Sequence, residues 1–168
     1  MQVHLVLGSN IEPREENLAG ALRRIRALPS LKVVGVSRIY ETAAVDLEED
    51  DPLPFLNLAV LVQTSIALQD LLKRLQGIEE ELGRRPEDRS KRRSRPIDID
   101  IVLASRKVVD EPDLKVPHPG LPERSFFLWP LVEISPNAVD PLTGTPLRHF
   151  LLSAHPPILN TLPPPEAL

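Results

Sequence analysis

Apolar residues along the first hundred positions recur with two periods, one typical of strands and one typical of helices. Short runs rich in valine, isoleucine and leucine predict four strands, over residues 3–7, 31–40, 55–64 and 96–103. Apolar side chains spaced three and four positions apart predict two helices, over residues 18–28 and 68–82. Pro13 suits the start of the first helix and Gly83 the end of the second, because proline is favoured in a first helical turn and glycine just after a last turn.

The resulting order, β-α-β-β-α-β, predicts an α+β fold with a ferredoxin-like core, in which an antiparallel sheet carries both helices on one face. The other face is left for a ligand or for a C-terminal extension. In that extension, residues 126–131 are apolar enough to be buried, whereas the proline-rich residues 156–165 are expected to be extended over the surface or disordered. No composition shift marks a boundary, so we expect residues 1–168 to form a single domain with a proline-rich tail at 156–168.

The composition is that of a soluble globular domain. Of the 168 residues, 42% are apolar and 26% are charged, which is enough for a core and a solvated surface. Cysteine is absent, which excludes disulfides, zinc–thiolate sites and cysteine nucleophiles. The sequence has no secretory signal pattern and no apolar run that could span a membrane, so a cytoplasmic protein without a membrane partner is expected. A net charge of −4 argues against a general nucleic-acid binder.

The fourth predicted strand carries two carboxylates on one face. Asp98 and Asp100 are two positions apart, so their side chains point the same way. The alternate residues point to the other face and can fill a core: Ile97, Ile99, Ile101 and Leu103. Neighbouring carboxylates are costly unless a cation lies between them, and Mg²⁺ suits this place because it takes carboxylate oxygens together with substrate phosphates. The stretch just upstream offers basic groups that can bind phosphate, and so predicts chemistry on a nucleotide: Arg84, Arg85, Arg89, Lys91, Arg92, Arg93 and Arg95.

Several short motifs occur in an order that resembles one enzyme family. They are Leu7-Gly8-Ser9-Asn10, Tyr40-Glu41-Thr42, Phe55-Leu56-Asn57-Leu58-Ala59-Val60, Ile78-Glu79, Gly83-Arg84, Arg95-Pro96-Ile97-Asp98-Ile99-Asp100-Ile101, Val116-Pro117-His118 and Arg124-Ser125-Phe126-Phe127-Leu128-Trp129-Pro130-Leu131. Over about the first 135 residues the chain resembles the 6-hydroxymethyl-7,8-dihydropterin pyrophosphokinases of folate synthesis. The resemblance implies an enzyme that moves the β,γ-pyrophosphoryl group of ATP, its co-substrate, onto the hydroxymethyl group of a dihydropterin and leaves AMP. It also implies two Mg²⁺ ions, and we expect a monomer.

The resemblance assigns the phosphate chemistry to acids and arginines. Asp98 and Asp100 would bridge the two Mg²⁺ ions, and Arg95 and Arg84 would contact the transferring phosphates as catalytic residues. The positions that match the family's nucleotide site are Gln76, Glu79, Arg84, Arg92, Arg95, Ile101, His118 and Arg124. Residue type alone leaves alternatives open, because Glu79 could equally be an acid on the helix surface and a lone histidine is more often structural. For Arg85 and Arg89 a solvated charged loop is the favoured interpretation.

A pterin is a flat, polar ring system that needs aromatic faces for stacking and a polar partner for its edge. By resemblance, Phe55 and Phe126 are the stacking pair and Asn57 reads the edge of the ring, although core packing is the alternative for both phenylalanines. The remaining positions that match the substrate site are the loop residues Thr42, Ala43 and Val45, which use main-chain groups, and the acid Asp98. Trp129 also matches a family position, but we interpret it as a core residue.

Three places depart from the family pattern. The family usually has a tryptophan followed by Gly-Pro where this chain has Arg92-Arg93-Ser94, a glycine where it has Asp46, and an aromatic residue where it has Pro119. These differences are expected to change affinity and loop dynamics but not the type of reaction.

Two segments of opposite charge could border the same cleft. Residues 46–51, the acidic loop, carry five acids, and residues 84–95, the basic loop, carry seven bases, so the two could attract each other as the site closes. The residues alone also leave two other functions open. One is an ordinary kinase or nucleotidyltransferase that uses the same acid pair, and the other is a non-catalytic ferredoxin-like module that binds RNA or a small ligand.

Overall fold

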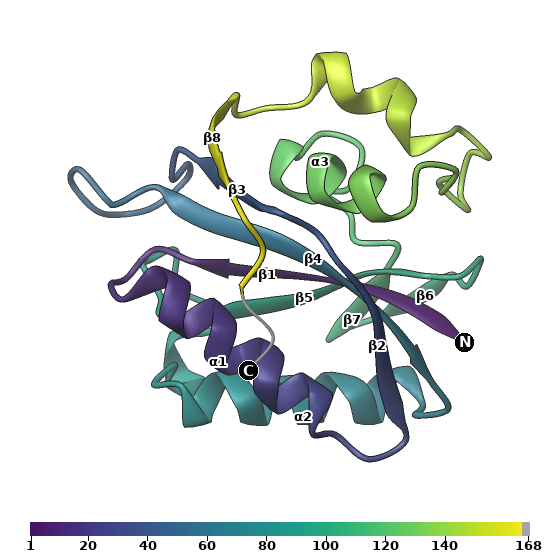
Figure 1. Cartoon of the computed structure of the whole chain (residues 1–168), viewed down its shortest axis with the longest axis horizontal. Helices are drawn as coiled ribbons and strands as arrows, with labels where there is room; N and C mark the ends of the chain where they lie inside the picture. The colour runs from purple at the N-terminus through teal and green to yellow at the C-terminus, as the bar shows by residue number, and fades with distance from the viewer. Residues whose placement is uncertain (166–168) are drawn as a thin grey trace.

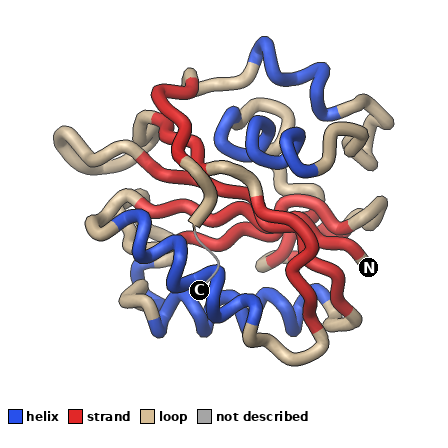
Figure 2. Tube along the Cα trace, viewed as in Figure 1, coloured by secondary structure: helices blue, strands red, loops and turns tan. Residues whose placement is uncertain are grey.

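A computed structural model describes residues 1–165 of the chain, and it contains two sheets, three α-helices and two short 3₁₀ helices (Figures 1 and 2). The strands of the main sheet are β1 (Gln2–Ser9), β2 (Leu31–Val36), β3 (Ile39–Thr42), β4 (Phe55–Thr64), β5 (Asp98–Ala104) and β8 (Ile158–Leu162). A separate hairpin is formed by β6 (Val109–Glu111) and β7 (Leu114–Val116). The helices are α1 (Arg14–Arg26), α2 (Leu68–Glu81), η1 (Pro86–Asp88), α3 (Ser125–Ile134) and η2 (Leu147–Ser153).

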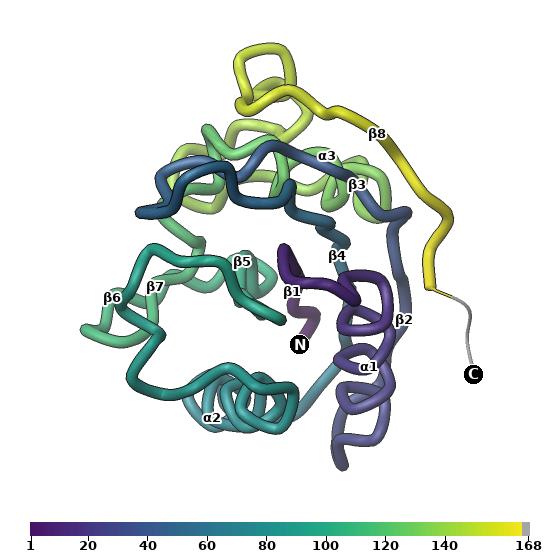
Figure 3. The backbone as a smooth tube through the Cα atoms, turned by 90° about the vertical axis from the view of Figure 1, so that its left-hand side faces the viewer, coloured from purple at the N-terminus to yellow at the C-terminus, as the bar shows by residue number. Residues whose placement is uncertain are grey.

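The main sheet is antiparallel in all its pairings and has the order β5-β1-β4-β3-β8, with β2 paired to β4 beside β3. Helices α1 and α2 cover one face, and α3 with η2 covers the other (Figures 1 and 3). The predicted α+β class with an antiparallel sheet is therefore confirmed. Among the described residues, no helix has both the length and the apolar character needed to cross a membrane.

Each face of the sheet packs against its own apolar cluster, because successive side chains of a strand point to opposite faces. On β1, Leu5 and Leu7 pack toward α1 and α2, whereas Val6 packs toward α3. On β4, Leu58 packs toward α1 and α2, whereas Ala59 packs toward α3. The two clusters fix which side chains of β1, β4 and β5 are free to line a site.

The stretch 31–40, predicted as one strand, is two strands in the structure. The interruption is at Ser37, which is fully buried. Its hydroxyl accepts a hydrogen bond from the Ala59 amide at 2.8 Å and donates to the Arg38 carbonyl at 2.7 Å. The Ser37 hydroxyl thus accepts the Ala59 amide hydrogen bond that a main-chain carbonyl would accept in a regular strand pair, and β2 ends here.

Two further expectations are wrong in detail. A register shift between β1 and β5 turns Leu103 toward α3, so it does not share a face with Ile99 and Ile101. Residues 126–131 lie in α3, which buries Phe127 against the sheet but leaves Trp129 39% exposed, so Trp129 is not a core residue.

The proline-rich stretch 156–165 is extended rather than disordered, because β8 pairs with β3 at the edge of the sheet. Residues 166–168 of the predicted tail lie outside the described residues.

Candidate active site

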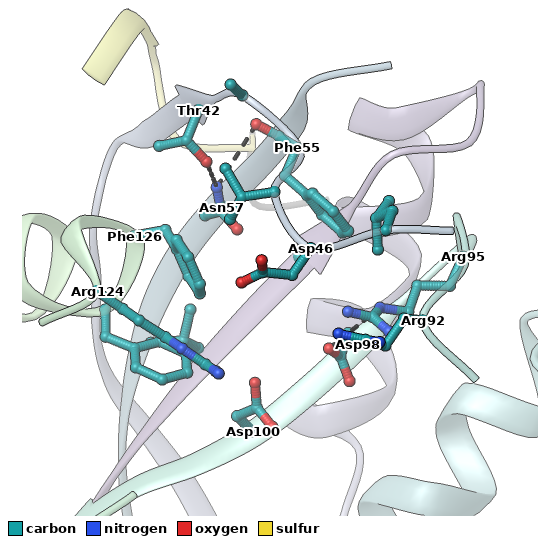
Figure 4. A pocket seen from close by; sticks show the side chains of 16 residues that line it. Thr42, Asp46, Phe55, Asn57, Arg92, Arg95, Asp98, Asp100, Arg124 and Phe126 are labelled. Atoms are coloured by element: carbon teal, nitrogen blue, oxygen red, sulfur yellow. Dashed lines mark hydrogen bonds and ion pairs between the residues drawn. The ribbon is translucent and has the colours of Figure 1, made fainter. Parts of the chain in front are cut away.

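A pocket lies on the α3 face of the sheet, where β1, β4 and β5 meet the acidic and basic loops (Figure 4). Its lining consists of Val6, Gly8, Thr42, Ala43, Val45, Asp46, Leu47, Phe55, Asn57, Arg92, Arg95, Asp98, Asp100, Arg124, Phe126 and Phe127. The lining combines acids, arginines and aromatic rings, which a site for a charged and partly flat ligand needs.

Strand register sets the floor of this pocket. Gly8 on β1 lies opposite Asp98 on one side and Asn57 on the other, and the next residue on the same face, Val6, lies opposite Asp100. A Cβ atom at Gly8 would be 3.1 Å from Asn57 Oδ1 and 3.5 Å from the Phe55 ring. Glycine therefore keeps the space between the acid pair and Asn57 open for a ligand.

Asp98 has cationic partners on both of its oxygens. Arg84 Nη1 is 2.5 Å from Oδ1, and Arg95 Nε is 3.3 Å from Oδ2. Burial favours the neutral acid, but Arg95 and Arg84 outweigh this effect and lower the pKa of Asp98 below its usual value. Asp98 is thus held ionised.

Asp100 is in the opposite situation. Its nearest ionisable partner is His118, whose Nε2 is 4.0 Å from Oδ1. Burial, together with repulsion from Asp98 and Glu79, raises the pKa of Asp100 well above its usual value. Burial and the nearby Arg124 lower the pKa of His118 to about 4, so His118 is neutral at pH 7 and adds no balancing charge.

The acid pair therefore fits a divalent cation. Two carboxylates share one strand face, and the charge of one of them is poorly compensated by the protein. Within residues 1–165, no cluster of three or more histidine, cysteine or acidic side chains could hold a metal ion. A cation held by Asp98 and Asp100 would need further oxygen ligands from water or from a substrate, as Mg²⁺ usually does.

Glu79 is not an acid on the helix surface, since it is only 3% exposed. Its Oε1 accepts hydrogen bonds from the Ile99 amide at 2.8 Å and from Arg84 Nη1 at 3.1 Å. Arg89 pairs with its other oxygen and also reaches the Gln76 carbonyl at 2.9 Å, so the interpretation of Arg89 as a solvated loop residue is wrong. Burial raises the pKa of Glu79, and Arg84 opposes this shift.

The aromatic side chains frame a slot. Phe55 and Phe126 lie on opposite sides of the pocket with Asn57 between them (Figure 4). The Arg95 guanidinium lies 5.5 Å from the Phe55 ring centre, and that of Arg124 lies 5.7 Å from the Phe126 ring centre. Asn57 Nδ2 donates to Thr42 Oγ1 at 3.1 Å, and this bond directs Oδ1 toward the pocket floor beside Gly8.

The structure brings most of the predicted site residues together. Every residue predicted for the pterin lines the pocket: Thr42, Ala43, Val45, Phe55, Asn57, Asp98 and Phe126. Of the predicted nucleotide residues, Arg92, Arg95 and Arg124 also line it. Arg84 and His118 lie behind the acid pair, and Gln76 and Glu79 lie farther back on α2. The Ile101 side chain is in the core on the face of the sheet that α1 and α2 cover, so only its main chain could contribute to the site.

Sequence reasoning did not assign five of the lining residues: Val6, Gly8, Asp46, Leu47 and Phe127. For Val6 and Gly8 the signal was alternation along β1, which becomes informative only once the register with β5 is known. Asp46 carries a positive φ of 58°, a backbone conformation usual for glycine, and this turn directs the acid toward the pocket (Figure 4).

Comparisons with known proteins agree on one family. A sequence model described as 7,8-dihydro-6-hydroxymethylpterin-pyrophosphokinase (HPPK) matches residues 4–136. The 2-amino-4-hydroxy-6-hydroxymethyldihydropteridine pyrophosphokinase of Aquifex aeolicus is 38% identical over 148 residues, which are 88% of this chain and 89% of that protein. The enzyme of the same name from Bacillus subtilis is 43% identical over 131 residues, 78% of this chain and 76% of that protein.

Among solved structures, the wild-type HPPK-DHPS of Plasmodium falciparum matches with a TM-score of 0.66 and 15% identity, covering 90% of this chain. The chain spans less than half of that longer protein, 44% of its length. At this identity the likeness concerns the fold alone.

Proposed function

Because the chain belongs to the 7,8-dihydro-6-hydroxymethylpterin-pyrophosphokinase family, we propose that it makes the diphosphate of 6-hydroxymethyl-7,8-dihydropterin in folate biosynthesis. The pyrophosphoryl group comes from ATP. The hydroxymethyl oxygen of the pterin attacks the β-phosphorus, the bond from that phosphorus to the α,β-bridging oxygen breaks, and AMP leaves with that oxygen.

One observation carries this proposal. The pocket places a phenylalanine slot with an amide at its edge directly beside an acid pair and three arginines. A flat ring between Phe55 and Phe126 would meet Asn57 Oδ1, which can accept a hydrogen bond from a ring N–H or an amino group. The hydroxymethyl group of that ring would then lie toward Asp98. This juxtaposition suits a substrate that is aromatic at one end and phosphorylated at the other.

The charged side chains have separate roles in the proposal. Arg92, Arg95 and Arg124 bind and orient the triphosphate, because a guanidinium meets phosphate oxygens with two parallel hydrogen bonds. Asp98 and Asp100 would hold two Mg²⁺ ions, which would neutralise phosphate charge and make the attacking hydroxyl more acidic. Asp98 would lie beside the hydroxymethyl group and is the proposed acceptor of its proton, because a bound cation would lower the pKa of that hydroxyl. Arg84 positions Asp98.

The proposal extends to the finer topology. Elements β1-α1-β2-β4-α2-β5, with the sheet order β5-β1-β4-β2, correspond to a ferredoxin-like core, and the elements after β5 correspond to a C-terminal extension. We also propose a single-domain, cytoplasmic monomer that binds neither nucleic acid nor membranes.

The test is to incubate the protein with ATP, Mg²⁺ and 6-hydroxymethyl-7,8-dihydropterin and to identify the products by liquid chromatography. We expect AMP and the pterin diphosphate in equal amounts. Asp98→Asn and Asp100→Asn should each reduce turnover about 100-fold or more, since each removes a charge that binds the cation. Asp110→Asn, on the exposed β6, is the matched control and should keep full activity. Formation of ADP instead of AMP would indicate an ordinary kinase. If no product forms when the dihydropterin is added, the proposal is contradicted.

A further inference from the structure

The acidic and basic loops together build one wall of the pocket. Asp46 and Leu47 of the acidic loop and Arg92 and Arg95 of the basic loop all line it. The two loops are far apart in sequence, so their relative position depends on contacts between them and on contacts of each with the sheet. Those contacts decide where the arginines stand.

Glu49 and Ser94 make the strongest contact between the loops. Glu49 Oε1 accepts a hydrogen bond from the Ser94 amide at 2.5 Å, and Oε2 accepts one from the Ser94 hydroxyl at 2.6 Å. These bonds lower the pKa of Glu49 and keep it ionised. The Glu48 amide also donates to the Arg92 carbonyl at 2.8 Å, next to the segment that carries Ser94.

Direct charge attraction contributes less. The side chains of Arg92 and Glu48 are 3.5 Å apart, but they are 67% and 62% exposed. An ion pair this exposed is weak and is screened by salt. The contact between Glu49 and Ser94 also lies at the surface, but there one carboxylate accepts two hydrogen bonds, one of them from a main-chain amide. The two loops are therefore joined mainly through Ser94 and Glu49.

Asn10 attaches this contact to the sheet. It is 1% exposed and follows β1 directly. Its Nδ2 donates to Ser94 Oγ at 2.9 Å and to the Leu53 carbonyl at 3.3 Å, while its Oδ1 accepts from the Arg95 amide at 2.8 Å. One buried amide thus fixes the end of the basic loop, and the segment that follows the acidic loop, next to the strand that carries Gly8.

We propose that Glu49 and Ser94, anchored by Asn10, are positioning residues that hold the two loops as one unit and place Arg92 and Arg95 against the pocket before substrates bind. When the arginines are already in place, less conformational entropy is lost as the substrates bind. The inference rests on the proposed function only in taking the arginines as phosphate ligands.

Limited trypsin digestion of the substrate-free protein tests the contact itself, because Lys91, Arg92 and Arg93 place cleavage sites next to Ser94. Glu49→Gln and Ser94→Ala should each speed cleavage at these sites about threefold to tenfold. Asp50→Asn, an exposed neighbour in the acidic loop, and Ser94→Thr, which keeps a hydroxyl, should match the wild type. The double variant Glu49→Gln, Ser94→Ala should be cleaved no faster than the faster single variant, because both changes break one interaction.

Kinetics of the folded enzyme test the positioning role. Glu49→Gln and Ser94→Ala should raise KM for ATP and for the dihydropterin about threefold or more, with little change in the melting temperature and recovery in Ser94→Thr. A purely structural role would lower the melting temperature and leave KM unchanged. Equal cleavage rates in all variants, or effects of the two changes that multiply, would overturn the proposal. Since digestion requires no turnover, a wild type without pyrophosphokinase activity would contradict the proposed function and not this contact.

Discussion

Glu79 is the residue at which α2, β5 and the basic loop meet. Its carboxylate receives the Ile99 amide from β5 and guanidinium groups of Arg84 and Arg89 from the basic loop. Arg84 in turn reaches Asp98, so the position of a pocket acid depends on a buried acid outside the pocket. A buried carboxylate without such partners would be strongly unfavourable.

Removing Glu79 should therefore be among the most destabilising single changes in the protein. In Glu79→Ala the buried Arg84 loses a partner, and we expect the free energy of unfolding to fall by about 3–5 kcal/mol in urea titrations. Glu80→Ala is the control, because Glu80 also contacts Arg89 but is 47% exposed, and it should change the free energy of unfolding by about 1 kcal/mol at most. Similar stabilities for the two variants would show that the buried network contributes little.

Between elements, hydrogen bonds to Glu133 link the two sides of the pocket. Tyr40 on β3 donates to Glu133 on α3 at 2.5 Å, and Glu133 also pairs with Arg38 at 3.4 Å. Strand β3 ends at Thr42, which binds Asn57, and α3 carries Phe126. Burial and the neighbouring Glu133 raise the pKa of Tyr40 to about 12, so Tyr40 remains a neutral donor through neutral pH.

Tyr40→Phe tests this link while keeping the ring. It should lower the free energy of unfolding by about 1.5–3 kcal/mol, the range for a hydrogen bond to a charged group, and raise KM for the dihydropterin. Urea titration and steady-state kinetics measure the two effects. Arg38→Gln, which removes the exposed partner of the same carboxylate, should cost about 1 kcal/mol or less. If Tyr40→Phe is as stable as the wild type, the Tyr40 hydroxyl adds nothing to the contact between β3 and α3, and the Arg38 amide bond to Glu133 and apolar packing carry it.

Elements that local pattern determines were predictable from the sequence, and elements that depend on a distant partner were not. The strand predicted at 55–64 has the bounds of β4, and the helix predicted at 68–82 differs from α2 by one residue. In contrast, β8 forms in a proline-rich stretch because β3 offers it an open edge. The division between β2 and β3 depends on a serine hydroxyl that bonds another strand.

The candidate site divides in the same way. Alternation placed Asp98 and Asp100 on one face, and the family motifs identified Phe55, Asn57 and Phe126, all of which line the pocket. The role of Gly8 could not be predicted, because it depends on the register of β1 with β4 and β5. The joining of the two loops required contacts between residues more than forty positions apart, such as Glu49 and Ser94, which no local pattern contains.

Over the whole molecule, one face of the sheet serves both stability and the site. The apolar cluster under α3 includes Val6 and Phe127, and the pocket begins at these same residues. The end of α3 that starts at Ser125 lines the pocket, while the remainder covers the core. Changes in the packing of α3 on the sheet are therefore expected to affect stability and substrate binding together.

His4 lies where the far end of α3 meets β1, and it should make the stability of the whole protein depend on pH. It is 5% exposed, its Nε2 is 2.7 Å from Ser135 Oγ, and within residues 1–165 its Nδ1 has no hydrogen-bond partner. Burial lowers its pKa from 6.5 to about 4, so the folded protein holds it neutral. Between these values the unfolded chain binds more protons than the folded one. The free energy of unfolding should therefore fall as the pH drops from about 6.5 to 4, by as much as about 3 kcal/mol from this residue.

Urea titrations of the wild type and His4→Gln across this range isolate the effect, because every other titrating group is common to both proteins. The advantage of the wild type should be largest above pH 6.5 and shrink steadily toward pH 4. Ser135→Ala is the control, since it removes the hydrogen bond but leaves His4 buried, and its pH dependence should follow that of the wild type. If the His4→Gln variant instead loses stability on acidification as steeply as the wild type, the acid sensitivity of the fold must arise at other groups, and the contact between β1 and α3 would tolerate a charged imidazole.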